Sequence, residues 1–260
     1  MNIIEKLISG YPDADVSPQD FIDHLSIGAP GWQMAWLSIA LAVIFGLLVY
    51  IIPIYLCEKN KQGPYPLWMH TFYCAADFMG IWVFLDAWAK YQHFPLFLLL
   101  AIGEAIWVCM EIFCLQRSLT YEKDIIWEPG TSFKSHLRDV IIEVVCFYVG
   151  LNFLRFELHD STMWKFWIFT QVLITIVPGL AMEKHGYTRG FNKALHVVLI
   201  CVAVVSFNPW CNMWVAVKPE FFSISANPWY YIMGVVCLFF AIRGLVMYDK
   251  LPKDLPAKKK

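Results

Sequence analysis

Carboxylic acids inside long apolar stretches are the residues of this chain that could carry chemistry. Asp77, Glu104, Glu111 and Glu143 all lie within hydrophobic runs. A charge at bilayer depth is costly, so acids there are rare and usually face the protein interior or a water-filled cavity. A carboxylic acid kept neutral by a low dielectric can donate a proton at neutral pH. These acids therefore indicate acid–base catalysis or proton-coupled binding.

Several polar and aromatic residues share helix faces with these acids or lie at a similar depth. Residues three, four and seven positions apart lie on one face of a helix, which places His70 and Tyr73 on the face of Asp77. The candidates for catalysis are Asp77, Glu104 and Glu111. The candidates for substrate binding are His70, Tyr73, Trp107, Glu143, Asn152, His196 and Arg243.

The depth of these residues predicts one shared pocket. At about 1.5 Å of rise per residue, Asp77 and Glu104 lie near the middle of the membrane. We expect the two side chains to face the same internal cavity, with their carboxylates within about 10 Å of each other. His70, His196 and Arg243, together with Glu111 and Glu143, fall in the half nearer the cytoplasm, so the pocket should open towards that side.

A purely structural interpretation of the same residues is that they pair with one another and hold the helices together. Arg243 could pair with Glu111 or Glu143, and His70 could pair with Asp77. Packing alone rarely requires four acids and two histidines inside the spans of a small bundle, so the sequence favours a functional site.

The elements that must position these residues are long apolar helices. The chain of 260 residues is 59% hydrophobic and 16% charged, and lipid must cover the apolar surface that such a chain cannot bury. Because a spanning helix needs about 20 apolar residues, we predict an all-α, polytopic bundle of seven transmembrane helices. The predicted spans are 31–56, 65–88, 94–119, 138–156, 164–183, 192–215 and 228–248.

Basic residues predict the orientation of the bundle. With seven spans, fifteen of the 20 Lys and Arg residues fall on the side of the C-terminus, so the positive-inside rule places the N-terminus outside and the C-terminus in the cytoplasm. The predicted regions are an extracytoplasmic segment 1–30, a transmembrane domain 31–248 and a basic tail 249–260. Ser17-Pro18-Gln19-Asp20 has the pattern of a helix start, which predicts a short surface helix in the first region.

Other classes of function lack their motifs. There is no HExxH, GxSxG, GxGxxG, P-loop or DDxxD pattern, and the eight cysteines form no CxxC pair. We therefore predict no metal and no cofactor. A net charge of -1 argues against nucleic acid as a partner. The expected partners are the lipid bilayer and a hydrophobic small molecule, with the endoplasmic reticulum (in a eukaryote) or the plasma membrane (in a bacterium) as the location.

At this level the chain resembles the small seven-span membrane terpene cyclases of fungal meroterpenoid and indole-diterpene pathways. The resemblance rests on length, span count, orientation and the acidic, aromatic second span YPLWMHTFYCAADFMGIWVFLDAW. It implies an enzyme that protonates an isoprenoid, with one acid in the second span and another near the last. Asp77 matches the first in location. The family's Trp-Glu pair is absent, and the seventh span has no embedded acid, so the second role would pass to Glu104 or Glu111.

The rival function is a transporter or channel for a small solute, in which Asp77, Glu104 and Glu111 bind a cation or relay protons. The shape of the pocket separates the two. An enzyme for a hydrophobic substrate should have an aromatic cavity that is closed on one side and open sideways to lipid. A transporter should have broken helices or a polar path that reaches both surfaces.

Overall fold

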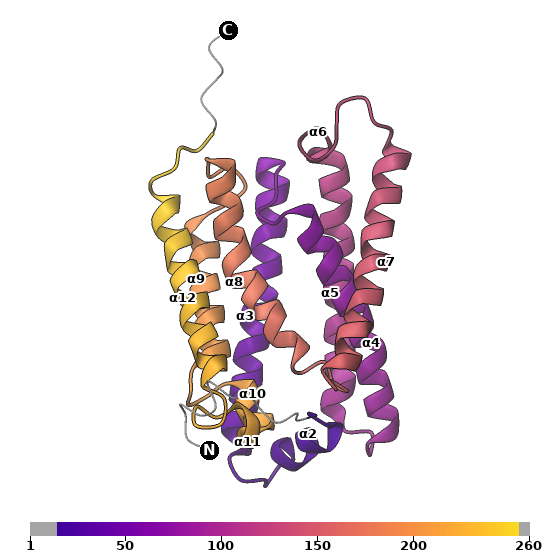
Figure 1. The fold of residues 1–260 in the computed structure, drawn as a ribbon, viewed down its shortest axis with the longest axis vertical. Helices are drawn as coiled ribbons and strands as arrows, with labels where there is room; N and C mark the ends of the chain where they lie inside the picture. The colour runs from indigo at the N-terminus through magenta and orange to yellow at the C-terminus, as the bar shows by residue number, and fades with distance from the viewer. Residues whose placement is uncertain (1–14, 255–260) are drawn as a thin grey trace.

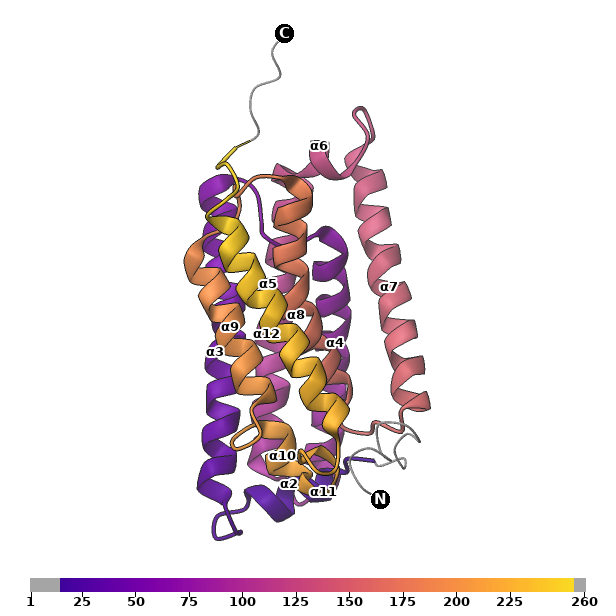
Figure 2. The same ribbon diagram turned by 60° about the vertical axis from the view of Figure 1, so that its left-hand side comes forward.

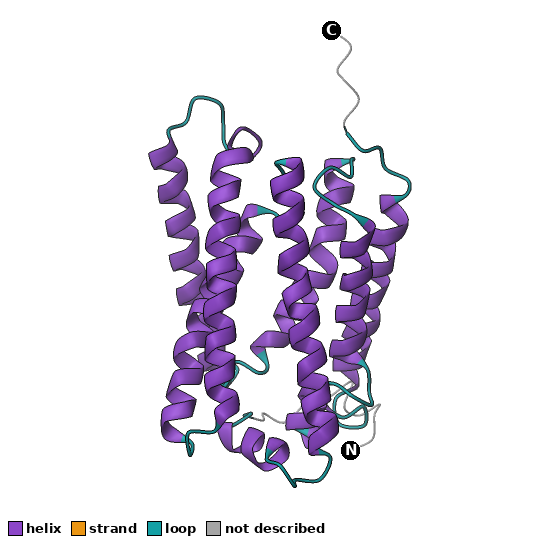
Figure 3. Cartoon of the chain, turned by 180° about the vertical axis from the view of Figure 1, so that it is seen from behind, coloured by secondary structure: helices purple, strands orange, loops and turns teal. Residues whose placement is uncertain are grey.

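The computed structural model describes residues 15–254. Residues 1–14 of the predicted extracytoplasmic segment and residues 255–260 of the predicted basic tail lie outside the described part. The described part is helical and contains no strand, as Figures 1 and 3 show. The seven longer helices are α3 (Trp32–Asn60), α4 (Leu67–Lys90), α5 (Pro95–Tyr121), α7 (Phe133–Glu157), α8 (Phe166–His185), α9 (Lys193–Phe207) and α12 (Pro228–Tyr248). The short helices are α2 (Pro18–Leu25), α6 (Lys123–Ile126), α10 (Met213–Val217) and α11 (Pro219–Phe222).

Five of the helices are long and apolar enough to cross a membrane: α3, α4, α5, α8 and α12. Large apolar side chains also cover the outside of the bundle, among them Ile44, Ile102 and Phe239, which are 51%, 50% and 58% exposed. Exposed apolar surface on this scale requires an apolar environment. The chain is therefore a helical, multi-pass membrane protein.

Two of the predicted spans differ from the helices that the structure contains. The predicted span 192–215 was too long, because α9 ends at Phe207. Asn208 stops the helix there, since its side-chain oxygen accepts hydrogen bonds from the backbone N–H groups of Trp210 and Cys211. The predicted span 138–156 was too short, because α7 already begins after Ser132, whose side chain caps the helix.

The long helices run side by side, and each end of the bundle has its own short elements. Helices α2, α10 and α11 gather at one end, here called the α2 end, and α6 lies at the other, here called the α6 end (Figures 1 and 2). Helices α4 and α5 form an antiparallel pair that α7 flanks, whereas α3, α8, α9 and α12 form the rest of the bundle. The loops 61–66 and 186–192 meet at the α6 end, where the Gln62 amide donates a hydrogen bond to the Tyr187 hydroxyl (2.9 Å).

The helix predicted after Ser17 is present as α2, and it closes the α2 end. The Asp20 carboxylate accepts a hydrogen bond from the Ser17 backbone N–H at 2.7 Å, which is one half of a capping box. Phe21 is fully buried, and its ring lies edge-on to Trp164, with a centroid distance of 4.7 Å. The Lys218 ammonium holds the outer face of α2 through an ion pair with Asp20 (2.8 Å). This contact between distant segments fixes α2 over the bundle.

Candidate functional site

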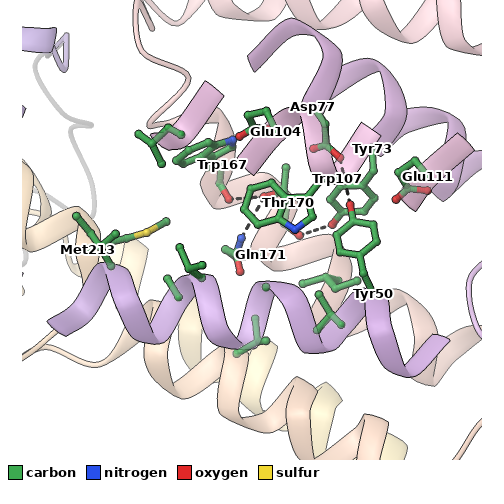
Figure 4. A pocket seen from close by; sticks show the side chains of 18 of the residues that line it. Tyr50, Tyr73, Asp77, Glu104, Trp107, Glu111, Trp167, Thr170, Gln171 and Met213 are labelled. Atoms are coloured by element: carbon green, nitrogen blue, oxygen red, sulfur yellow. Dashed lines mark hydrogen bonds between the residues drawn. The ribbon is translucent and has the colours of Figure 1, made fainter. Parts of the chain in front are cut away.

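A cavity of about 110 Å³ lies inside the bundle, where α3, α4, α5 and α8 surround it. One water molecule needs roughly 10–15 Å³ of such space, so the cavity has room for several waters or for a small apolar group. Its walls are mostly apolar and strongly aromatic, as Figure 4 shows. The aromatic residues in the lining are Tyr50, Tyr65, Tyr73, Trp107, Trp164 and Trp167.

The three candidate catalytic acids all line this cavity. Asp77 comes from α4, and Glu104 and Glu111 come from two turns of α5. Their side chains are buried, with 7%, 1% and 1% exposure. The structure therefore places Asp77 and Glu104 in one internal cavity, as their helical spacing predicts (Figure 4).

Glu104 reaches the cavity wall because α4 carries a glycine opposite it. A Cβ atom at Gly80 would lie only 2.7 Å from Cδ of Glu104, so any larger residue would displace this carboxyl group. Neither carboxyl oxygen of Glu104 has a hydrogen-bond partner within residues 15–254. The group is close enough to Asp77 for the two carboxyls to interact electrostatically. No Lys or Arg of the described chain lines the cavity, so this acid pair has no buried cation beside it.

Tyrosine and tryptophan rings line the cavity beside the acid pair. The Tyr50 hydroxyl donates a hydrogen bond to Oδ2 of Asp77 at 3.2 Å. The Tyr50 ring stacks on Trp107, with centroids 6.4 Å apart and an angle of 24° between the planes. Tyr73 is fixed by a hydrogen bond from its hydroxyl to the Thr170 carbonyl (2.6 Å). Such rings present negative faces that attract a cation.

One side of the cavity reaches the lipid-facing surface of the bundle. Val43 on α3 lines the cavity and is nevertheless 38% exposed. Gly46 on the same helix, and Leu100 and Trp107 on α5, also line it and are half-buried. These residues lie where α3 and α5 face each other, because the Trp107 ring comes within 3.3 Å of a Cβ built at Gly46. The cavity lining thus reaches the bundle surface between two candidate spans.

The α2 end of the cavity is closed by apolar packing. Trp164 and Met213 line the cavity at this end. Behind them Trp214 is fully buried, and its indole N–H donates a hydrogen bond to the Trp164 carbonyl at 2.7 Å. Phe21 of α2 packs on the other side of Trp164. Aromatic side chains therefore cover the cavity at this end.

The α6 end of the cavity carries a buried chain of polar groups. Glu111 lines the cavity, and its Oε2 lies 2.6 Å from Nδ1 of His70. His70 packs against the Tyr65 ring (centroids 5.7 Å apart) and interacts with Glu122 at the end of α5. Glu122 accepts a hydrogen bond from the Gly63 N–H at 2.7 Å. Burial raises the pKa of Glu122, while the Gly63 N–H and His70 act in the opposite direction.

The structure corrects two of the predicted ion pairs. His70 contacts Glu111 and not Asp77. Arg243 does not turn inward, because its guanidinium binds Glu183 of α8 (2.6 Å) and the side chain is 46% exposed. It therefore pairs with neither Glu111 nor Glu143 and does not line the cavity. A carboxylate one helix away, close to the bundle surface, gives Arg243 a partner without the cost of burial.

Three other predicted binding residues also lie away from the cavity. Glu143 is half-buried between α7 and α4, where it accepts a hydrogen bond from Thr71 (2.9 Å). Asn152 lines a separate hollow of about 460 Å³. His196 is fully buried beneath α12, with both ring nitrogens unpartnered among the described residues. Gly244 makes room for its ring, since a Cβ there would lie 2.9 Å from Nδ1. His196 is a packing residue in this arrangement.

Some lining residues were missed by the sequence analysis, and Tyr50 is the most consequential. It lies in the apolar stretch WLSIALAVIFGLLVYIIPIYL, where an isolated tyrosine does not stand out from its neighbours. The only signal was a hydroxyl group within a predicted span. Tyr65 was missed too, because it precedes α4 in a loop and its hydroxyl reaches back to the Val49 carbonyl (2.7 Å).

Neither metal ligation nor similarity to other proteins assigns a function. Within residues 15–254 no group of three His, Cys, Asp or Glu residues is placed to hold a metal ion. No protein-family model, curated protein or solved structure matches the chain. The functional argument therefore depends on the chemistry of the cavity.

Proposed function

We propose that this protein is an integral membrane enzyme that acts on a hydrophobic, isoprenoid-type substrate by protonating it. The observation that carries the proposal is the Asp77–Glu104 pair in an aromatic cavity with no Lys or Arg in its lining. Two neighbouring carboxyl groups in a low dielectric cannot both be ionised at low cost, so the pair is expected to hold a proton. That proton is the reagent that the reaction needs.

The remaining features of the cavity suit the steps that follow protonation. The proton adds to one carbon of a double bond, which leaves a carbocation on the other carbon. The faces of Tyr50, Tyr73 and Trp107 stabilise this cation as it migrates or closes a ring. Loss of a proton to the carboxylate ends the reaction, so the product is an isomer of the substrate and no cofactor is consumed. The cavity of about 110 Å³ would take the reacting end of a substrate dissolved in the bilayer, and the rest of the substrate would lie between α3 and α5 at the lipid-facing surface.

We further propose that α7 and α9 also cross the membrane, which gives seven spans. Helix α7 has 25 residues, a length of about 37 Å at 1.5 Å per residue, and exposes Ile141, Val145 and Val149 on its surface. Helix α9 is short, with 15 residues. Helices α10 and α11 follow it in the chain and lie at the α2 end (Figure 1). The basic loops lie at the α6 end, which would then face the cytoplasm with the C-terminus.

A reporter fused after Lys260 tests this orientation. We expect a fluorescent protein fused there to be inaccessible to protease added to sealed cells and to become accessible when the plasma membrane is opened. The same reporter at an extracytoplasmic N-terminus should be digested in sealed cells if the protein lies in the plasma membrane. It should remain protected after the plasma membrane is opened if the protein lies in the endoplasmic reticulum. A C-terminal reporter exposed on the outside would refute the seven-span orientation.

The reaction is tested by isotope incorporation. The purified protein in lipid nanodiscs is incubated in D₂O with farnesol, geranylgeraniol and their terminal epoxides, and the products are analysed by gas chromatography and mass spectrometry. We expect at least one substrate to yield a cyclic isomer with one deuterium at the protonated carbon. Recovery of all four compounds unchanged would count against an isoprenoid-protonating enzyme.

The second candidate is a proton- or cation-coupled transporter, and the buried pair of His70 and Glu111 favours it. This pair extends the polar lining from the cavity towards the α6 end. At the α2 end, the aromatic plug of Trp164 and Trp214 covers the cavity, and the lining residue Gln171 accepts a hydrogen bond from Ser206 (3.3 Å). Proteoliposomes with a pH-sensitive dye inside separate the two functions, since a transporter would dissipate a pH gradient when its solute is supplied and an enzyme would not.

A further inference from the structure

The polar groups between the cavity and the α6 end form a series that the proposed reaction does not by itself require. Glu111 faces the cavity, and His70 lies directly behind it, with 2.6 Å between Nδ1 and Oε2. Both side chains are nearly inaccessible, at 4% for His70 and 1% for Glu111. A buried acid and a buried imidazole in contact can exchange a proton, because an imidazole ring can accept a proton on one nitrogen and donate one from the other.

Both ends of this pair have a partner that can continue a proton path. On the cavity side, the Tyr50 hydroxyl interacts with Glu111 and donates a hydrogen bond to Asp77. On the other side, His70 interacts with Glu122, which the backbone of loop 61–66 holds through the Gly63 N–H. The first turn of α4 carries His70, and α5 ends beside Glu122, so this side lies at the α6 end.

We propose that His70 and Glu111 relay protons between the α6 end of the bundle and the Asp77–Glu104 pair. The proposal rests on the proposed proton chemistry of that pair. The His70–Glu111 pair is a buried acid–base contact that leads from the cavity lining towards the α6 end, whereas aromatic rings cover the α2 end.

Each transfer in the relay moves one proton from a donor to the next acceptor, and the series gains charge only through the proton that enters at the α6 end. His70 gives the proton on Nδ1 to Oε2 of Glu111 and takes up another on Nε2 from the side of Glu122. Glu111 passes its proton to the Tyr50 hydroxyl, either directly or through a water in the cavity, while the hydroxyl proton moves to Oδ2 of Asp77. No Lys or Arg lines the cavity in the described chain, so no fixed cation opposes a proton within it.

The relay is tested without any substrate, by infrared spectroscopy of the protein in phosphatidylcholine nanodiscs. The C=O band of a protonated carboxyl group shifts when its proton is exchanged for deuterium. The band of the pair is assigned as the one that Asp77→Asn or Glu104→Gln removes. After rapid mixing with D₂O, we expect His70→Gln to slow the shift of this band by about a hundredfold, and added imidazole to restore the rate.

A matched variant controls for general effects of the substitution. His136 is also buried, at 4% exposure, but lies on α7 and does not line the cavity, so His136→Gln should exchange at the wild-type rate. Should His70→Gln not fold, Glu111→Gln is measured instead; it should also slow exchange, and imidazole should not rescue it. Exchange in both variants at the wild-type rate, or no band assignable to the pair, overturns the relay. Slowed proton exchange in a protein that isomerises none of the isoprenoids would support the proposed relay and refute the proposed enzymatic function.

Discussion

Nanodiscs that carry the Asp77→Asn variant are expected to lose the isoprenoid isomerisation by a factor of about 10²–10⁴, the usual contribution of a positioned general acid. Asparagine keeps the shape of the side chain and can still accept the hydrogen bond from Tyr50, which is 3.2 Å from Oδ2 of Asp77. The amide has no titratable proton to donate. The protein should therefore fold and insert normally while the first step of the reaction fails. Product formation is measured by the deuterium assay, and folding by the thermal unfolding curve.

The same helix offers a matched control for this substitution. Asp86 on α4 is 60% exposed and forms an ion pair with Lys90 at 2.8 Å, and an exposed pair of this kind contributes little to stability. Asp86→Asn should therefore keep wild-type activity and a wild-type unfolding temperature. If Asp77→Asn, Glu104→Gln and Glu111→Gln all retain full activity, the buried acids are structural and the proposed chemistry is wrong.

The position of the acids could be predicted because two independent constraints agree on it. Helical periodicity placed Asp77 on one face of its span, and the cost of a charge in lipid required that face to turn inward. Glu104 and Glu111 on α5 follow from the same two constraints, and both line the cavity. It could not supply their partners, because the contact of His70 with Glu111 depends on how α4 and α5 are staggered against each other.

Arg243 shows where this reasoning fails. An arginine near the end of a span can satisfy its charge in the interior or at the bundle surface, and periodicity does not separate the two. The Arg243 side chain lies at the surface because the Glu183 carboxylate on α8 accepts two hydrogen bonds from its guanidinium there. The early end of α9 has a similar origin, since a hydropathy average passes over the turn that Asn208 forms with its neighbours. In both cases a single local interaction overrode a pattern spread over many residues.

The closure of the α2 end could not be predicted from the sequence either, because it joins segments that are far apart in the chain. Phe21 of α2, Trp164 before α8 and Trp214 of α10 meet in one aromatic cluster. Tryptophans near span ends are normally attributed to the membrane interface, where one edge of the ring is hydrated. Trp214 is instead fully buried, with its indole N–H bonded to the Trp164 carbonyl. This burial makes the cluster a structural plug as well as a wall of the cavity.

Replacement of Trp214 by alanine is accordingly expected to destabilise the protein by about 3–5 kcal/mol, the usual cost of deleting a large buried aromatic side chain. The variant loses the packing against Trp164 and Tyr230, whose rings lie 5.9 Å and 6.1 Å from that of Trp214. Thermal unfolding can be followed with a thiol-reactive dye, since Cys74 and Cys237 are buried in the folded protein. The unfolding temperature should fall by several degrees.

Trp210, four residues before Trp214, supplies the control for this prediction. Trp210 is 86% exposed, so Trp210→Ala should change stability by less than about 0.5 kcal/mol. Loss of the plug in Trp214→Ala should also let water reach the cavity from the α2 end. Water captures a carbocation, so the variant should convert part of the substrate to hydroxylated products in place of the cyclic isomer. Equal unfolding temperatures for the two variants, with no hydroxylated product from either, would show that the cluster neither holds the bundle together nor excludes water.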